Sequence, residues 1–340
     1  MCIYDLATQS TPVNKKVKGF LIYNKYKRWM AMKKKITVFG SFVVDLMGRT
    51  PHLPQKGETV IGSMFQMGPG GKGFNQGVAA HKAGSDITMI TKVGKDAFAD
   101  VALNIMKELK MNSDYVFSAE DVQTGVALIM VDENTSQNEI VVIPGACNNI
   151  KDEEIDKAEE VIKNSEYLLT QLETNMSAIE SIVDIAHKNG VKVILNTAPI
   201  QPITDDLLSK VDMVTPNEVE AEILTGIKIE TEEDMRNTAK YFFDRGVKQV
   251  VITLGHRGVY IADGAIDELI PAYKVKALDT TGAGDAFNGG LIAALAEGKS
   301  LKEAAKFANG LAALSVQKLG TTMSMPWRED IDAFLKAQNK

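Results

Sequence analysis

Short runs of β-branched and aliphatic residues alternate with amphipathic segments along most of the 340-residue chain. The runs span residues 36–40, 87–91, 167–170, 191–195, 211–214 and 250–254. The segments between them carry apolar residues at helical spacing. Strands that are apolar throughout must be covered by helices on both faces of their sheet. The pattern therefore predicts an α/β fold with a parallel central sheet flanked by helices.

Two segments interrupt this alternation, at about 42–67 and about 125–143. The first contains two prolines and an alternating stretch, and the second holds two apolar runs around a turn-rich sequence. We expect them to form antiparallel strands of a small separate sheet, which beside an α/β core is suited to covering a site. Residues 35–340 are therefore predicted to form one domain, with these two segments as its lid.

The beginning of the chain differs in composition from the rest. Residues 1–35 carry nine lysines and arginines and one acid, Asp5, whereas the whole chain has a net charge of −6. This head has no clear periodicity. We therefore expect residues 1–34 to be a disordered extension without function, and Met32 to be a natural start.

Composition also limits the partners and the compartment. The acidic balance argues against a nucleic-acid-binding surface. The apolar runs are far shorter than the roughly 18 residues that a membrane helix needs. Two distant cysteines, Cys2 and Cys147, build neither a disulfide framework nor a zinc site. We expect a cytoplasmic protein that binds neither nucleic acid nor membranes.

The most informative motif is the run DTTGAGDAFNGG, which starts at Asp279. It follows a strand-like run and opens a helix, so Gly282, Ala283 and Gly284 let backbone N–H groups approach an anion. Asp285 falls in the first helical turn, where it faces both a bound phosphate and an incoming hydroxyl. Phosphoryl transfer needs this positioning, charge stabilisation and a base. The alternative is structural: an aspartate that caps a helix after a glycine turn.

A glycine-rich run, GPGGKGFNQ, spans residues 68–76. It is not a Walker phosphate loop, because Gln66 stands where that motif needs its first glycine and Gly73 follows the lysine. It fits G-x-G-x-x-G but lacks the context of a dinucleotide site. We interpret it as a turn that brings backbone amides, Lys72 and Asn75 near a polyhydroxylated ligand. The alternative is a plain turn that starts a helix.

Two further runs follow predicted strands. The run TPNEVE at 215–220 places Asn217 and Glu220 three residues apart at a helix start, where they can share one face. An amide and a carboxylate there suit water-mediated contact with Mg²⁺ and phosphates. The run TLGHRG at 253–258 is similar to a loop at the edge of a nucleotide site. The structural alternatives are a helix cap and a β-turn.

Taken in order, these blocks resemble the ribokinase branch of the PfkB carbohydrate kinase family, over about residues 35–334. Both signatures of that family have counterparts, at 68–76 and 279–285. The resemblance implies a ribokinase-like fold, a parallel sheet with a small β-sheet lid that is often shared across a homodimer. It also implies ATP-dependent phosphorylation of D-ribose at O5, with Asp285 as general base.

The resemblance further implies roles for individual residues. The sugar would be held by Asp45, Gly71, Lys72, Asn75, Glu173 and Asp285, and the anion hole would be Gly282, Ala283 and Gly284. ATP and Mg²⁺ would lie among Asn217, Glu220, Thr253, Gly255, Gly258 and Asn309. A monovalent cation, K⁺, would lie at Asp279, Thr281, Ser315, Lys318, Gly320 and Ser324, mostly against backbone carbonyls.

One residue departs from the family pattern. The first block of the family usually reads Gly-Ser-x-Asn-x-Asp, and Val43 stands where that asparagine would contact a sugar hydroxyl. Valine forms no such bond, and an unpaired buried hydroxyl costs roughly 1–3 kcal/mol. This leaves 2-deoxyribose or another small sugar as an alternative substrate. From another class of function, the alternative is a noncatalytic sugar or nucleotide sensor on the same fold.

Overall fold

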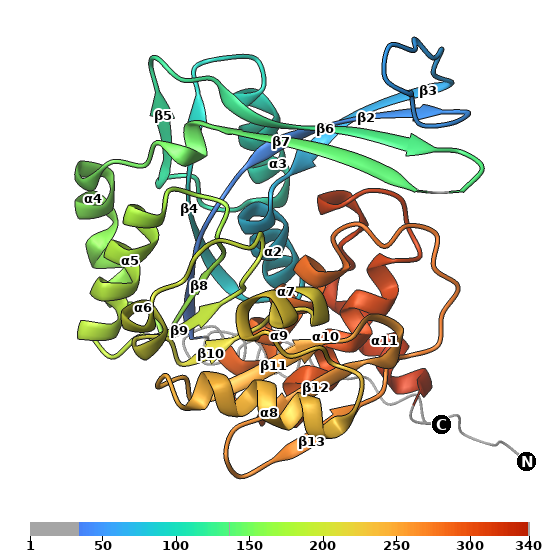
Figure 1. Ribbon diagram of the computed structural model, residues 1–340. Helices are drawn as coiled ribbons and strands as arrows, with labels where there is room; N and C mark the ends of the chain where they lie inside the picture. Colours follow the sequence, from blue (N-terminus) through green and yellow to red (C-terminus); the bar gives the residue numbers. More distant parts are fainter. Residues whose placement is uncertain (1–33, 136, 339–340) are drawn as a thin grey trace, which may run out of the picture.

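The computed structural model describes residues 34–135 and 137–338 (Figure 1). A large sheet flanked by helices forms the body, and a smaller sheet lies across the top of the view. The predicted α/β architecture is thereby confirmed. The extension expected at residues 1–34 lies outside the described residues except for Lys34, whose ammonium pairs with Glu166 at 2.7 Å.

Within the described residues, the central sheet has nine strands in the order β13-β12-β11-β10-β9-β8-β1-β4-β5. They are β1 Lys35–Phe39, β4 Asp86–Gly94, β5 Val116–Ala119, β8 Tyr167–Thr170, β9 Lys192–Leu195, β10 Met213–Val214, β11 Gln249–Thr253, β12 Val259–Ala262 and β13 Asp267–Ile270. From β11 to β5 the neighbours pair in parallel, but β12 and β13 pair antiparallel, so the sheet is mixed. The turn at Gly255–Arg257 is too short for the crossover that parallel strands need.

Helices cover both faces of this sheet. They are α2 Lys72–Lys82, α3 Ala99–Leu109, α4 Asp152–Lys163, α5 Met176–Lys188, α6 Asp205–Ser209, α7 Glu218–Thr225, α8 Glu232–Phe243, α9 Ala283–Ala296, α10 Leu301–Ser315 and α11 Arg328–Gln338. Leu169 of β8 belongs to a hydrophobic cluster with α2, α3, α9, α10 and α11, and its neighbour Leu168 to a cluster with α4 to α8. Burial on both sides explains the continuous apolar runs. No helix of the described chain has the length and apolar character needed to cross a membrane.

The smaller sheet, here called the lid sheet, has the order β3-β2-β6-β7. Its strands are β2 Val43–Thr50, β3 Met64–Gly70, β6 Thr124–Asp132 and β7 Asn138–Gly145. Two pairs are antiparallel as predicted, but β2 and β6 are parallel, so the prediction was wrong at this pair. The long connection through α2, β4, α3 and β5 lets the chain return in the same direction. The division into a domain of residues 35–340 and two lid segments stays a prediction.

Helices α2 and α9 pack closely because a glycine stands at their contact. A Cβ added to Gly289 of α9 would lie 2.5 Å from Ala79 Cβ and 2.6 Å from Gln76 O, both in α2. A larger residue would therefore push the helices apart. The close approach brings Asp285 of α9 into hydrogen-bonding distance of Asn75 and Gln76 of α2.

Gly289→Ala is expected to lower the free energy of unfolding by about 1–3 kcal/mol, because the added methyl group overpacks this contact. Chemical denaturation measures the loss. Gly48→Ala is the matched control, since a Cβ at Gly48 would meet Met64 O at an ordinary 3.9 Å. Equal stability of the two variants would contradict the tight packing of α2 on α9.

Candidate active site

The first turn of α9 is open to an anion. Gly282 precedes it with φ +75°, a left-handed conformation that favours glycine. No side chain caps this end of the helix. Ala283 N donates to Thr280 O at 3.2 Å, so the predicted anion hole depends on the N–H groups on either side of it. A Cβ at Gly284 would meet nothing within 4 Å. The predicted anion hole thus combines open space, a helix start without a side-chain cap and the positive end of the helix dipole.

Asp285 lies next to this opening and is buried. Its Oδ2 accepts a hydrogen bond from Asn75 Nδ2 and its Oδ1 accepts one from Gln76 Nε2, each at 3.0 Å. Burial raises the pKa of Asp285, while the charge of Lys72 and the two amide hydrogen bonds limit the rise. The carboxylate is therefore both a strengthened base and a group held in one orientation.

Sequence analysis did not single out Gln76, although it follows Asn75 in the same glycine-rich run. Gln76 Nε2 also donates to Asn196 Oδ1 at 3.0 Å, and Gln76 Oε1 accepts from Gln171 Nε2 at 2.7 Å. The side chains of Asn196 and Gln171 thus orient the amide that holds one oxygen of Asp285. The sequence signal that could have identified Gln76 is a second side-chain amide at the helix start that contains Asn75.

The glycine-rich run begins α2 where three chain segments meet. Gly71 has φ +92°, and a Cβ there would lie 2.9 Å from Phe42 Cα and Ser41 O. The backbone N–H of Lys72 donates to Glu173 Oε2 at 2.9 Å, and Ser41 Oγ also donates to that oxygen. The turn therefore places Gly71, Lys72 and Glu173 together, and the contact of this run with a ligand stays a prediction.

The Lys72 side chain lies among carboxylates. Burial lowers the pKa of Lys72, but the charges of Asp285, Glu173 and Glu220 outweigh burial and raise it above its usual value. The ammonium therefore stays protonated near neutral pH. Its field reaches the candidate base, the candidate sugar-binding residue Glu173 and the candidate nucleotide residue Glu220.

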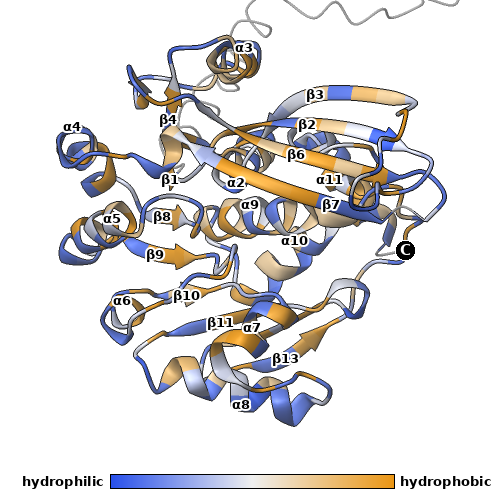
Figure 2. Ribbon diagram, turned by 45° about the horizontal axis from the view of Figure 1, so that its top comes forward, coloured by the Kyte–Doolittle hydropathy of each residue, from blue (hydrophilic) through white to orange (hydrophobic). Residues whose placement is uncertain are grey.

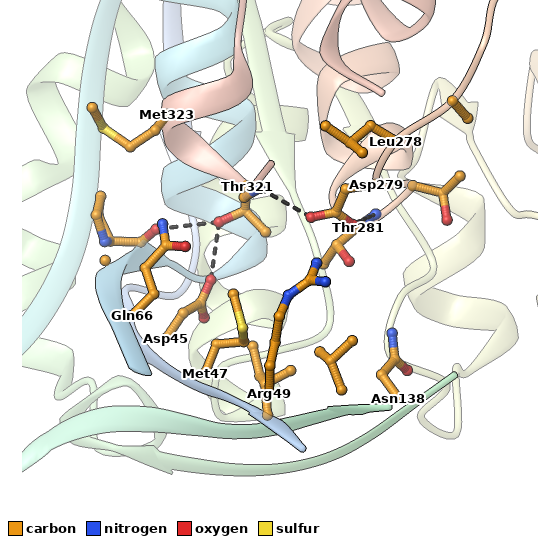
Figure 3. A pocket seen from close by; sticks show the side chains of 17 residues that line it. Asp45, Met47, Arg49, Gln66, Asn138, Leu278, Asp279, Thr281, Thr321 and Met323 are labelled. Carbon is orange, nitrogen blue, oxygen red and sulfur yellow. Dashed lines mark hydrogen bonds between the residues drawn. The ribbon is translucent and has the colours of Figure 1, made fainter. Parts of the chain in front are cut away.

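Asp45 comes to the site from the lid sheet. The pKa of Asp45 is raised to about 6, mainly by burial. A hydrogen bond from Thr321 Oγ1 at 2.9 Å opposes the rise, and the charges of Glu173 and Asp285 add to it. Figure 3 shows Asp45 in a cavity of about 320 Å³ between the lid sheet and the loops before α9 and after α10. Arg49 lines the same cavity from the same strand.

The residues predicted to contact the nucleotide lie at the start of α7 and the end of β11, which are neighbours, with one exception. Asn217 and Glu220 form a capping box at the start of α7, with Glu220 N donating to Asn217 Oδ1 at 2.8 Å. Thr253 ends β11 and forms a bridge with Asn217, and Gly255 begins the turn that follows. Gly258 closes that turn with φ +109°. The exception is Asn309, which lies on α10 and donates to Pro271 O at 3.4 Å.

The residues predicted for a monovalent cation lie around two loops that Asp279 joins. Its Oδ1 accepts from Thr281 N and its Oδ2 from Gly320 N, each at 2.9 Å. Ser315, Lys318 and Ser324 continue the second loop, where Lys318 N donates to Ser315 O and Ser324 Oγ to Thr321 O. Across the residues that the structure describes, no cluster of three or more His, Cys, Asp or Glu side chains could hold a metal ion.

Comparison with known proteins agrees with this geometry. A family model described as pfkB family carbohydrate kinase matches residues 33–328. A ribokinase of Haemophilus influenzae is 40% identical over 305 residues, which cover 90% of this chain and 99% of the relative. A deoxyribokinase of Salmonella typhi is 36% identical, covering 88% and 98%. The structure of Arabidopsis thaliana ribokinase complexed with ribose and ATP matches with a TM-score of 0.82 at 30% identity, covering 89% of this chain and 99% of that one.

Proposed function

The chain belongs to the pfkB family of carbohydrate kinases, and we propose that it phosphorylates D-ribose at O5 with ATP to give ribose 5-phosphate. The observation that carries this proposal is the buried carboxylate of Asp285, fixed by two amides beside an uncapped helix start. A base, an anion hole and a lid are the parts that transfer to a sugar hydroxyl requires.

In the proposed reaction, Asp285 accepts the proton of the sugar hydroxyl as its oxygen bonds to the γ-phosphorus of ATP. The bond from that phosphorus to the β,γ-bridging oxygen breaks, and ADP leaves. Backbone N–H groups at Gly282, Ala283 and Gly284 hold the charge that develops on the transferred group. Lys72 favours the ionised form of Asp285 before the transfer, since its positive charge opposes the rise in the pKa of that carboxyl that burial causes.

The sugar-binding roles follow from the same arrangement. We propose that Asp45 and Glu173 accept hydrogen bonds from sugar hydroxyls, and that Asn75 and Lys72 complete the pocket. The backbone at Gly71 would approach the ring closely, because that glycine has no side chain to block the approach. The charges of Glu173 and Asp285 act on both Asp45 and Lys72, which supports a single shared pocket.

ATP and its Mg²⁺ would occupy the neighbouring helix end. The carboxylate of Glu220 accepts hydrogen bonds from Asn217 N, Asn217 Nδ2 and Thr197 Oγ1, so it fits contact with hydrated Mg²⁺ better than direct ligation. We propose that Thr253, Gly255, Gly258 and Asn309 border the nucleotide. K⁺ would stabilise the loops at Asp279 and Gly320, whose carboxylate and N–H are already paired, so carbonyl oxygens would be its ligands.

Asp285→Asn is expected to lower kcat by about 10²–10⁴-fold, the usual worth of a positioned general base. An ADP-release assay with ribose measures it, and Asp205→Asn on exposed α6 serves as a control that keeps wild-type kcat. Sugar binding is expected to persist, because several other groups hold the sugar. A variant with more than half of the wild-type kcat would remove Asp285 from the role of base.

K⁺ is expected to activate the enzyme more than Na⁺ or Li⁺, mainly through kcat, because a weakly hydrated cation suits a site of backbone carbonyls. The measurement is ADP release in the three chloride salts at equal ionic strength. Identical kcat in all three would exclude a K⁺ site at the loops that Asp279 joins.

A second candidate substrate is 2-deoxyribose, which one buried side chain favours. Val43 is 2% exposed at the start of β2, two residues before Asp45 on the same face of the strand. A sugar hydroxyl that reaches Val43 finds no hydrogen-bond partner there. We rank ribose first because Asp45, Lys72, Asn75 and Glu173 are all retained. The deoxyribokinase relative supports keeping the second candidate.

Val43→Asn is expected to shift the ratio of kcat/KM for ribose over 2-deoxyribose toward ribose by about 5- to 30-fold, because one hydrogen bond is regained. The test measures both sugars in wild type and variant. Val43→Ala is the matched control, since it removes bulk without adding an amide. An unchanged ratio in Val43→Asn would mean that residue 43 does not read that hydroxyl.

We also propose that two copies of the chain pair through the lid sheet, in the cytoplasm. Figure 2 shows apolar colouring along β6 and β7. The exposed apolar side chains of this sheet are Met64, Phe65, Met67, Leu128, Ile140, Val141, Val142 and Ile143. Side chains alternate between the two faces of a strand, so Val141 and Ile143 of β7 lie with Leu128 of β6 on the face opposite the cavity. Exposed apolar side chains there are costly in water, and a second copy would cover them.

Light scattering is expected to give twice the mass of the chain. Val141→Asp, at a side chain that is 57% exposed, is expected to shift the protein toward the monomer, because it places a charge in the covered face. The exposed Val219→Asp on α7 is the control and should leave the mass unchanged. A wild-type protein with the mass of one chain would contradict the pairing.

A further inference from the structure

Two threonines outside every predicted set lie between the lid sheet and α2. Thr321 Oγ1 is 2.9 Å from Asp45 Oδ2 and 3.2 Å from Pro69 O. Thr322 Oγ1 is 3.0 Å from the same Pro69 O and also reaches Asn75 Oδ1. Figure 3 shows Thr321 pointing toward Asp45 in the cavity. The two threonines therefore connect two proposed sugar-binding side chains, Asp45 of the lid sheet and Asn75 of α2.

Thr321 also touches the anion hole. A Cβ at Gly282 would lie 3.4 Å from Thr321 Cα and 3.5 Å from its Cγ2, which is van der Waals contact. Immediately before it, Gly320 N donates to Asp279 Oδ2 at 2.9 Å. The segment thus lies against the start of α9, where Asp285 is held. A change at Thr321 is in reach of both the sugar pocket and the phosphate end of the site.

When Asp45 is ionised, the two threonine hydroxyls have fewer hydrogens than the acceptors around them. Each threonine has one hydroxyl hydrogen, whereas the carboxylate of Asp45, Pro69 O and Asn75 Oδ1 are three acceptors. Asn75 cannot turn its amide around, because its Nδ2 donates to Asp285. The group is therefore one hydrogen short.

The missing hydrogen can be supplied at Asp45, either by a donor that bonds to the carboxylate or by a proton on it. If a donor bonds to that carboxylate, Thr321 is free to donate to Pro69 O, and Thr322 then donates to Asn75 Oδ1 without competition. A proton on Asp45 has the same effect, and burial raises the pKa of this group to about 6. A sugar hydroxyl is the donor that the proposed substrate brings. Chains of hydrogen bonds polarise one another, so the change extends to the Asn75 amide that binds Asp285.

We propose that Thr321 and Thr322 are positioning residues that couple a sugar hydroxyl bound at Asp45 to the orientation of Asn75, and through Asn75 to the general base Asp285. The inference rests on the proposed function and deepens it. Through this coupling, a sugar bound at Asp45 of the lid sheet would change the orientation of the side chain that holds Asp285. Neither threonine needs to touch the reacting atoms.

The loop that carries the threonines has other anchors, so their hydroxyls can be removed separately. Lys82 Nζ donates to Met325 O at 3.0 Å, and Ser324 Oγ donates to Thr321 O at 2.7 Å. Together with Gly320 N on Asp279, these contacts hold the backbone. Valine has nearly the shape of threonine without its hydroxyl. Thr→Val variants therefore test hydrogen bonding at constant packing.

The kinetic experiment compares Thr321→Val and Thr322→Val with wild type in an ADP-release assay with ribose from pH 5.5 to 8.5. Thr321→Val is expected to raise KM for ribose about 5- to 30-fold below pH 7, because Asp45 without this donor is more often protonated and then accepts a sugar hydroxyl less well. It should also move the acid limb of kcat/KM to higher pH, because the lost bond favoured ionised Asp45. Thr322→Val is expected to lower kcat by a similar factor with a smaller change in KM.

Two sets of variants make the result specific. Thr321→Ser and Thr322→Ser keep the hydroxyl and are expected to restore wild-type kinetics. Thr238→Val on α8 is the matched control, since its Oγ1 is buried without a hydrogen-bond partner. Unchanged KM and pH profile in Thr321→Val, unchanged kcat in Thr322→Val, or failure of the serine variants to restore activity would each overturn the proposal.

A measurement without turnover separates this inference from the proposed function. Thr321 stabilises ionised Asp45, so Thr321→Val is expected to lose more melting temperature at pH 8 than at pH 5, where Asp45 is protonated. A loss that is equal at both pH values overturns the coupling, even if ribose is a substrate. Wild type that turns over neither ribose nor 2-deoxyribose overturns the proposed function, whatever the melting data show.

Discussion

The arrangement of the site depends on the buried carboxylate of Asp285. A carboxylate that loses its water must find hydrogen-bond donors and a positive charge within the protein. Asn75 and Gln76 supply the donors and Lys72 the charge, and all three lie in the first five residues of α2. The packing of α2 on α9 through Gly289 is therefore both a core contact and the condition for a charged base. A looser contact would change the chemistry along with the stability.

The second constraint is an excess of acceptors. The charges of Glu173 and Asp285 raise the pKa of Asp45, the charge of Glu173 raises the pKa of Asp285, and Lys72 is the cation beside Glu173 and Asp285. Ionised carboxylates accept hydrogen bonds and donate none. A pocket of this composition is completed by a neutral ligand that brings several O–H groups, which is the chemistry of a sugar. The hydrogen missing between Asp45 and Thr321 is a local instance of the same imbalance.

Local sequence patterns predicted the buried strands and the helices, but not the direction of strands or contacts between distant segments. The run at 167–170 is β8 without any change of bounds, because its four residues are all buried. The antiparallel edge at Val259–Ala262 was missed, since a buried strand reads the same in either direction. In the site, Asp285 and Asn75 stand in recognisable motifs. Thr321 does not, because its partner Asp45 lies 276 residues away and the contact exists only in the folded chain.

The lid sheet offers few side chains with which to choose among sugars. Val43 pairs with Gly70 on one side and Gly125 on the other, so of these three positions Val43 alone carries a side chain. A Cβ at Gly70 would lie 2.2 Å from Asp45 Oδ1, and one at Gly125 would lie 2.5 Å from Pro144 O. Neither glycine can be replaced by a residue that supplies the hydrogen bond Val43 lacks. A hydroxyl at this row therefore meets an apolar group beside an acceptor, and selectivity at this point depends on a single side chain.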